Sequence, residues 1–266
     1  PAFFAKTNEL IELTKVAGEY GGGYISHMRS EGNTIYEALE ELITIAKEAK
    51  CHGELYHIKL AGKDNWPKID SLIRRIERAR SEGIDISANM YTYTAGATGL
   101  TACFPPSLQD GGFDKLWKRL GDNKIKADMI KAMNTNASDW ENLYYGSGGA
   151  DNVLILGFRQ DSLKKYVGKT LAQIAKIRGK SPEETAIDLI RDDSSRVEVA
   201  YFMMNEDNVK KELALPWVSF GSDEGSYATE GKFLTFNAHP RAYGTFARVL
   251  GKYSRDEKVI SLAEAI

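Results

Sequence analysis

Two periodicities of apolar residues alternate along the chain. Short, nearly continuous apolar runs, typical of strands buried on both faces of a parallel sheet, separate longer segments in which apolar residues return every three or four positions. The runs that predict strands are residues 22–28, 53–60, 84–91, 152–158, 197–203 and 217–223. Strands that alternate with helices in this way predict right-handed crossovers and an α/β fold with a parallel sheet.

The longer segments predict amphipathic helices, some with recognisable ends. They include residues 8–19, 34–50 and 69–82. A capping box of Thr34 and Glu37 would begin the second helix, and Ser181 and Glu184 in "SPEE" would form another at the start of a later helix. Pro182 suits the first helical position, where its missing N–H would have had no partner in the helix.

The pattern weakens from about residue 97 to 150, where turn formers and aromatic residues predominate. No linker-like composition brackets this stretch. We therefore expect residues 1–266 to form a single domain in which residues 97–150 are an insertion over one end of the sheet.

The composition indicates which kinds of partner the protein can bind. With 42% hydrophobic and 27% charged residues over 266 positions, the chain can bury a sizeable core. Acidic and basic residues are interspersed and nearly balanced, which argues against nucleic acid and membrane and leaves a small molecule as the expected partner. Two cysteines are too few for a disulfide framework, and no signal peptide or long apolar run is present, so we expect a cytoplasmic protein.

Two of the four histidines and one aspartate stand where predicted strands end. His27 and His57 end consecutive strands, and Asp223 ends a later one. In a parallel α/β barrel every strand delivers its C-terminal end to the same face, so these side chains would point into one pocket. Neutral imidazoles suit Zn²⁺, and a carboxylate can bind the metal or accept the proton of a metal-bound water. Each residue alone also fits a loop, core or helix-capping role, but their joint occurrence favours a zinc site.

Several blocks of the sequence resemble one enzyme family, in order and over nearly the whole chain. They are "AKTNELIELTKVAGEYGGGYISHMRSEG", "ELYHIKLAG", "ANMYTYTAGATGL", "SPEETAIDLI", "WVSFGSDEG" and "HPRAYGTFARVLGKYSRDEKVISLAEAI". Together they are similar to the N-acyl-D-amino-acid deacylases, or D-aminoacylases, of the amidohydrolase superfamily. The resemblance implies a zinc-dependent (β/α)8 TIM barrel that hydrolyses an N-acyl-D-amino acid to a carboxylate and the free D-amino acid. It also implies that His27 and His57 bind zinc and that Asp223 is catalytic.

Three further residues are candidates for binding the substrate. Lys59 lies two residues after His57, so its ammonium emerges on the same side of the strand as that imidazole. Arg241 can bind a carboxylate through two parallel hydrogen bonds, a role that the resemblance supports. Tyr91 offers a phenol as hydrogen-bond donor. Each of the three also allows a simpler interpretation, as a surface cation or a packed aromatic ring.

The chain departs from the family pattern in two ways. The family carries His-x-His on the first barrel strand and a metal-binding cysteine on a later one, whereas no His-x-His occurs here and neither Cys51 nor Cys103 is suitably placed. Asn89 stands where the family pattern leads us to expect an aspartate. Because the chain also opens with Pro1 and stops in what resembles the first turn of a helix, we expect an incomplete barrel from the C-terminal part of a longer enzyme.

Two other functions remain open from the sequence. A cyclic-amide amidohydrolase of the dihydroorotase or hydantoinase type would use a similar barrel, ordinarily with a carboxylated lysine that bridges two metals. A non-catalytic α/β binding domain would use the same histidines as structural residues.

We predict that the chain by itself binds zinc weakly and has little or no activity. Two histidines and an aspartate leave the zinc coordination incomplete, and an opened barrel exposes strand edges that favour self-association or pairing with a missing N-terminal segment. The test is an assay of the purified 266-residue chain with zinc on N-acetyl-D-methionine and N-acetyl-D-glutamate. Detectable turnover without any added segment would contradict the prediction.

Overall fold

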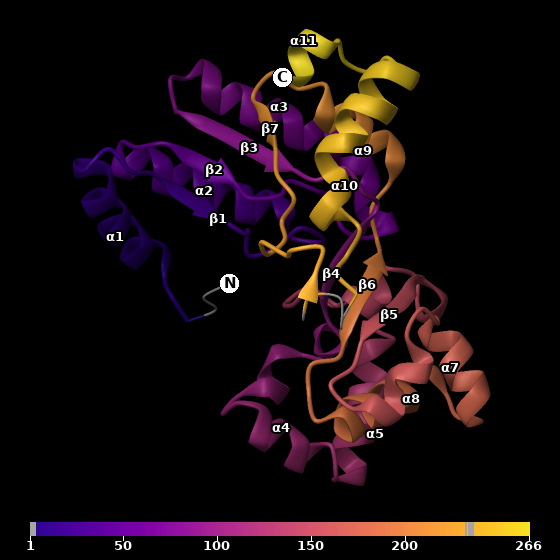
Figure 1. Ribbon diagram of the computed structural model, residues 1–266. Coiled ribbons are helices and arrows are strands. Elements are labelled where there is room, and N and C mark those ends of the chain that lie inside the picture. Colours follow the sequence, from indigo (N-terminus) through magenta and orange to yellow (C-terminus); the bar gives the residue numbers. More distant parts are fainter. Residues whose placement is uncertain (1–3, 232, 234–236) are drawn as a thin grey trace.

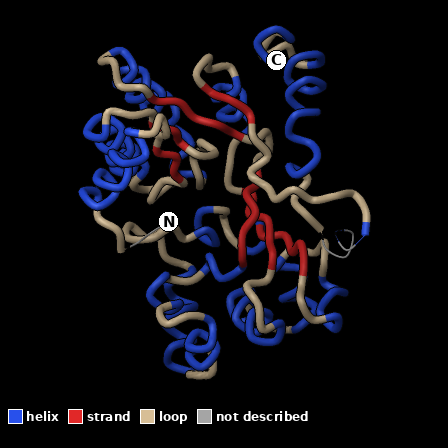
Figure 2. Tube along the Cα trace, turned by 60° about the vertical axis from the view of Figure 1, so that its left-hand side comes forward, coloured by secondary structure: helices blue, strands red, loops and turns tan. Residues whose placement is uncertain are grey.

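The computed structural model describes residues 4–231, 233 and 237–266. Its strands form two separate sheets, and each sheet has its own hydrophobic core (Figures 1 and 2). We call the part built on the first sheet, residues 4–94 and the described residues after 204, the parallel lobe. The part built on the second sheet, residues 95–204, is the antiparallel lobe.

All four strands of the parallel lobe run in the same direction. They pair in the order β1 (Tyr24–Ser26), β2 (Gly53–Leu55), β3 (Ile86–Met90) and β7 (Val218–Phe220). Each lies inside an apolar run that predicts a strand, although the strands are shorter than the runs because the runs continue into the following loops. The predicted α/β fold with a parallel sheet is confirmed for this lobe.

Helices cover one face of the parallel sheet (Figure 1). The helical segments of this lobe are α1 (Thr7–Glu19), α2 (Ile35–Ala49), η1 (Lys63–Lys68), α3 (Ile69–Ser81), α9 (Glu206–Leu213), α10 (Arg241–Arg248), η7 (Val249–Asp256) and α11 (Leu262–Ala265). Leu39 and Leu42 of α2 share a helix face, as do Leu72 and Ile76 of α3, and all four join the core beneath the strands. None of the helices in the described ranges has the length and apolar composition needed to cross a bilayer.

The two predicted capping boxes have different outcomes. Ser181 Oγ accepts the N–H of Glu184 at 3.1 Å, and the Glu184 carboxylate accepts the N–H of Ser181 at 3.2 Å, which confirms that box. The box at Thr34 is wrong, because its side chain makes no capping hydrogen bond. Ser30 Oγ instead accepts the N–H of Thr34, at 3.3 Å, so the preceding loop supplies the acceptor.

The antiparallel lobe differs from the sequence-based expectation. Residues 152–158 and 197–203 do form strands, but the prediction that they belong to the parallel sheet is wrong. They are β5 (Val153–Gly157) and β6 (Glu198–Phe202), and both run antiparallel in a sheet of order β4-β6-β5, with β4 at Ala95–Gly99. Buried strands have similar apolar runs in either sheet type, and the small residues of β4, "AGATG", give no strand signal.

Helices surround this second sheet (Figure 2). They are η2 (Leu100–Cys103), η3 (Pro106–Gln109), α4 (Phe113–Arg119), α5 (Asn123–Met133), α6 (Leu143–Gly146), η4 (Ala150–Asn152), η5 (Asp161–Tyr166), α7 (Leu171–Arg178) and α8 (Pro182–Asp193). Ala61 and Tyr91, which follow β2 and β3, also belong to the core of this lobe. The antiparallel lobe therefore packs against the C-terminal end of the parallel sheet.

Apolar side chains are exposed on both sides of the parallel sheet. At the β1 edge, Ile25 of β1 is 54% exposed, and Leu13 and Val16 of α1 are exposed as well. Beyond β7, Tyr243 and Phe246 of α10 and Leu250 of η7 are exposed. Within the described residues, β1 and β7 each pair with a strand on one side only.

Glu212 of α9 is a buried carboxyl group. Its side chain is 2% exposed, and its Oε1 has no hydrogen-bond partner among the described residues. Burial raises the pKa of Glu212 to about 8, with Lys59 acting in the opposite direction. The neutral acid is therefore the form that the folded protein favours.

We predict that Glu212→Gln stabilises the protein at alkaline pH. A folded-state pKa raised from 4.5 to about 8 gives stability that is complete below pH 4.5 and is lost as the pH rises through about 8. The melting temperature of the variant should therefore rise relative to that of the wild type between these pH values, as measured by circular dichroism. Glu77→Gln on the exposed face of α3 is the matched control. If the difference in melting temperature between Glu212→Gln and wild type does not change with pH, the prediction is contradicted.

Candidate metal centre

The C-terminal ends of β1 and β2 bring His27 and His57 together. His27 directly follows β1, His57 lies two residues beyond β2, and the two strands are parallel neighbours. His27 Nδ1 lies 3.1 Å from His57 Nε2. His57 has the left-handed φ of 42°, and its N–H donates to Asn89 Oδ1 at 2.8 Å. The asparagine that departs from the family pattern thus holds the backbone of a predicted zinc ligand.

Glu31 is a member of this cluster that the sequence did not reveal. The residue is buried, and its Oε1 lies 2.8 Å from His57 Nδ1, 3.5 Å from His27 Nδ1 and 2.7 Å from Lys59 Nζ. In the sequence it stands in the polar stretch "RSEGN", which is typical of a solvated loop. Its spacing of four residues from His27 was the available signal, and that spacing is informative only on a helix.

Charge pairing keeps Glu31 and Lys59 ionised although both are buried. Burial alone raises the pKa of Glu31, but the Lys59 ammonium and then His57 outweigh it and hold that pKa well below its usual range. Burial likewise lowers the pKa of Lys59, and the Glu31 carboxylate outweighs it and raises that pKa above its ordinary value. Burial lowers the pKa of His27, which favours the neutral imidazole that a metal requires.

The tautomer of His57 determines what the pair of histidines can do. With the proton on Nδ1, His57 donates to Glu31 and directs the lone pair of Nε2 toward His27 Nδ1. With the proton on Nε2, the ring donates to His27 and accepts at Nδ1 from Lys59, whose Nζ is 2.5 Å away. The first tautomer is the one that binds a cation, and a carboxylate behind the ring favours it.

The donor set fits zinc. Two ligands of a tetrahedral zinc ion lie about 3.3 Å apart when their bonds are about 2.0 Å long, and the two facing imidazole nitrogens match this spacing at 3.1 Å. The ligand atoms of His27, Glu31 and His57 all lie within 4.8 Å of one another. Two imidazoles with a carboxylate in reach form a set that suits Zn²⁺ better than Ca²⁺ or Mg²⁺.

Asp223 and Arg241 form a second polar group beside the first. Arg241 Nη1 lies 2.6 Å from Asp223 Oδ2, and Arg241 Nε donates to Glu224 Oε1 at 3.2 Å. Asp223 follows β7 with a φ of 51°, in the left-handed region that a non-glycine residue seldom occupies. It is not one of the groups within 4.8 Å of one another at the histidines. Its predicted convergence with the zinc ligands stays a prediction.

Tyr91 connects the two groups. The Arg241 guanidinium carbon lies 4.5 Å from the centroid of its ring, and Lys59 Nζ lies 5.4 Å from the same centroid. Burial raises the pKa of Tyr91, so its phenol stays protonated and can donate a hydrogen bond. The structure thus brings the three predicted substrate-binding residues, Lys59, Tyr91 and Arg241, into one contiguous set.

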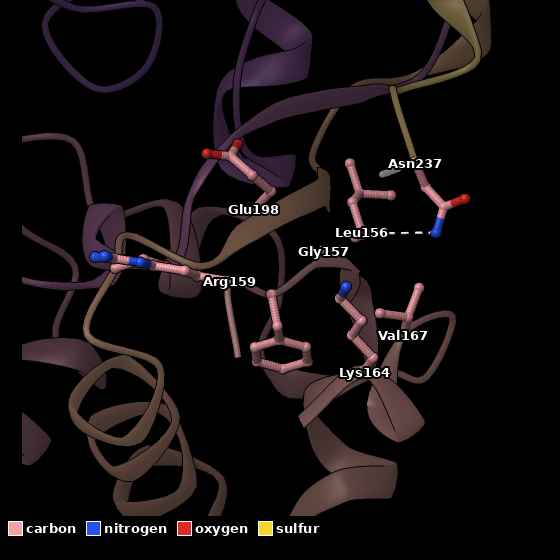
Figure 3. A pocket seen from close by; sticks show the side chains of 9 residues that line it. Leu156, Gly157, Arg159, Lys164, Val167, Glu198 and Asn237 are labelled. Atoms are coloured by element: carbon pink, nitrogen blue, oxygen red, sulfur yellow. Dashed lines mark hydrogen bonds between the residues drawn. The ribbon is translucent and has the colours of Figure 1, made fainter. Parts of the chain in front are cut away.

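A cavity in the antiparallel lobe contains none of the predicted site residues (Figure 3). It has a volume of about 480 Å³ and lies between β5, the start of β6 and Asn237. Two of its cations, Arg159 and Lys164, point in different directions in Figure 3, so they do not converge on one ligand. We therefore place the chemistry at the strand ends of the parallel lobe.

Comparisons with known proteins relate the whole chain to one group of enzymes. No protein-family profile matches the chain. A curated D-aminoacylase from Alcaligenes xylosoxydans xylosoxydans is 29% identical over all 266 residues, and the chain spans 43% of that relative. The crystal structure of a D-aminoacylase described as defining a novel subset of amidohydrolases covers the whole chain, with 30% identity and a TM-score of 0.71. The chain spans 44% of that structure.

A further solved structure adds information on the fold. It is an N-acyl-D-glutamate deacylase from Bordetella bronchiseptica in complex with zinc and a phosphonate inhibitor that mimics the tetrahedral intermediate. It matches the whole chain with 24% identity and a TM-score of 0.71, again over 44% of its own length. The comparisons confirm the resemblance to the D-aminoacylases, and the chain spans less than half the length of these relatives.

We predict that Glu31→Ala lowers the free energy of unfolding by about 3–5 kcal/mol, because the Lys59 ammonium then stays buried without its carboxylate. The double variant Glu31→Ala/Lys59→Met should recover most of this loss, since neither buried charge remains. Urea denaturation of the single and double variants measures the coupling.

The matched control is Glu82→Ala, which breaks the exposed ion pair with Arg78 and should leave stability almost unchanged. A Glu31→Ala variant as stable as this control would show that the buried pair does not constrain the fold.

Proposed function

We propose that this chain provides the metal-binding and substrate-binding strand ends of a zinc-dependent hydrolase of N-acyl-D-amino acids, which yields a carboxylate and a free D-amino acid. The observation that carries the proposal is the pair of imidazole nitrogens 3.1 Å apart, backed by Glu31 and Lys59, in a chain similar to D-aminoacylases over its whole length. The preference for the D-enantiomer rests on that similarity.

His27 and His57 would hold the zinc ion, with Glu31 behind His57. A bound zinc ion supplies Lewis-acid polarisation of the amide carbonyl and an acidified water. Asp223 would accept the proton of the attacking water and deliver it to the nitrogen of the leaving amine. The C–N bond of the amide then breaks with the amine as a neutral leaving group.

Lys59, Arg241 and Tyr91 would position the substrate. Arg241 offers a planar donor to the substrate carboxylate, but in this structure it pairs with Asp223 and Glu224. A substrate carboxylate at Arg241 therefore competes with Asp223 for the guanidinium. Binding of the substrate would weaken the Asp223 ion pair and leave that carboxylate more available as a base.

The edges of β1 and β7 that are unpaired within the described residues indicate how this sheet fits into a larger barrel. We propose that β1, β2, β3 and β7 are part of a (β/α)8 barrel, and that the insertion expected at about residues 97–150 lies within the larger antiparallel lobe, residues 95–204. The exposed apolar residues beside β1 and β7 would pair with an N-terminal segment or with a second copy of the chain. The two free cysteines agree with a cytoplasmic location.

The competing cyclic-amide amidohydrolase is less well supported. Its bridging ligand would be a carboxylated lysine, and carboxylation needs a neutral amine. Lys59, the lysine beside the histidines, pairs with Glu31 at 2.7 Å, and its pKa lies above the ordinary value because Glu31 outweighs the effect of burial. The ammonium form is thus favoured, which opposes carboxylation.

We predict that Asp223→Asn lowers kcat by about 10²–10⁴-fold, because the amide cannot accept the proton of the attacking water. The assay is hydrolysis of N-acetyl-D-methionine by the chain reconstituted with the N-terminal segment that completes the barrel. Zinc content should be unchanged, and Asp256→Asn, an exposed aspartate of η7, is the matched control. Wild-type turnover by Asp223→Asn would contradict the assigned role.

A further inference from the structure

The loop between β1 and α2 is held by both lobes. This loop, residues 27–34, carries His27 and Glu31. From the parallel lobe, Lys68 Nζ donates to the carbonyl of Asn33 at 2.9 Å. Toward the antiparallel lobe, Asn33 Nδ2 donates to Asn136 Oδ1 at 2.7 Å. Residues more than 100 positions away in the sequence thus fix the loop beside the histidines.

Glu141 makes the contact nearest to the cluster. It lies between α5 and α6 in the antiparallel lobe, and its Oε1 accepts a hydrogen bond from the backbone N–H of Glu31. The carbonyl of the same residue, Glu31, accepts the N–H of Ala61 at 2.8 Å. Both hydrogen-bonding groups of the Glu31 main chain are therefore paired, the N–H with Glu141 of the antiparallel lobe and the carbonyl with Ala61 of the parallel lobe.

This backbone contact sets where the Glu31 carboxylate lies. One oxygen of that carboxylate, Oε1, is 2.8 Å from His57 Nδ1 and 2.7 Å from Lys59 Nζ. A shift of the Glu31 backbone by 1 Å or so would take both contacts out of hydrogen-bond range. The His57 tautomer with the free Nε2 depends on the first contact, so it depends on the backbone position as well.

Electrostatics do not favour a negative charge on Glu141, because the Glu31 carboxylate is nearby. A second carboxylate beside Glu31 is repelled by it, and the hydrogen bond to the Glu31 N–H offsets that cost. Glutamine has the same acceptor oxygen without the charge. The geometry therefore requires a hydrogen-bond acceptor at residue 141, and it does not require a negative charge there.

We propose that Glu141 is a positioning residue through which the antiparallel lobe holds Glu31 in place to orient His57. The inference rests on the proposed zinc site. The affinity of the parallel lobe for zinc then depends on a side chain of the antiparallel lobe that contacts the backbone of Glu31 and is not a member of the cluster of His27, Glu31 and His57.

The test compares Glu141→Ala, Glu141→Gln and the control Glu183→Ala in the 266-residue chain. Glu183 also belongs to the antiparallel lobe, where it accepts from Tyr144 Oη at 2.8 Å and Asn134 Nδ2 at 3.1 Å. Zinc affinity is measured by competition with a chromogenic chelator. Glu141→Ala should bind zinc about 10–100-fold more weakly, whereas Glu141→Gln and Glu183→Ala should keep the wild-type affinity.

A second readout does not need zinc. Hydrogen exchange of the Glu31 amide in the metal-free chain should accelerate in Glu141→Ala and stay slow in Glu141→Gln and Glu183→Ala. Wild-type exchange or wild-type zinc affinity in Glu141→Ala would overturn the proposal, as would an equal loss of affinity in Glu183→Ala. If the wild-type chain binds no zinc even when it is reconstituted with the N-terminal segment that completes the barrel, the metal site of the proposed function fails. Unchanged exchange of the Glu31 amide in Glu141→Ala separately decides against Glu141.

Discussion

The site is constrained by one buried oxygen, Glu31 Oε1. It accepts from Lys59 and faces His57 Nδ1, so it balances a buried ammonium and offers an acceptor to the His57 tautomer that carries its proton on Nδ1. A charge buried without its partner costs several kcal/mol, about 3–5 when one member of a pair is removed. Lys59 can therefore stay inside the protein only while Glu31 stays beside it, and the fold must keep the 27–34 loop in place.

The two lobes meet where the strands of the parallel sheet end. Gly62 donates its N–H to the carbonyl of Met203 at 2.9 Å, and Trp66 Nε1 donates to the same carbonyl at 2.9 Å. Ala61 and Tyr91 pack into the core of the antiparallel lobe. The Lys59 ammonium and the Arg241 guanidinium lie over the ring of Tyr91. The proposed site thus lies at a boundary that both lobes form, and the antiparallel lobe takes part in shaping it.

The pairing of His27 with His57 could be predicted because parallel neighbours deliver their C-terminal ends to one edge of the sheet. The helix beginning at Pro182 could be predicted because its capping box is local in sequence. Glu31 could not be found in this way, since a glutamate in a polar loop is normally solvated. Its backbone is held by hydrogen bonds with Glu141 and Ala61, which approach it only in the folded chain.

The sequence by itself determined the helices α1, α2, α3 and α8, the positions of six strands, and the two histidines at neighbouring strand ends, because periodicity and capping are local properties of the chain. Tertiary structure decided which sheet β5 and β6 join, and that Arg241 pairs with Asp223 and Glu224. It also decided that Glu31 lies behind His57. Strand direction and the partner of a buried charge depend on contacts between distant segments, and no local pattern of residues specifies them.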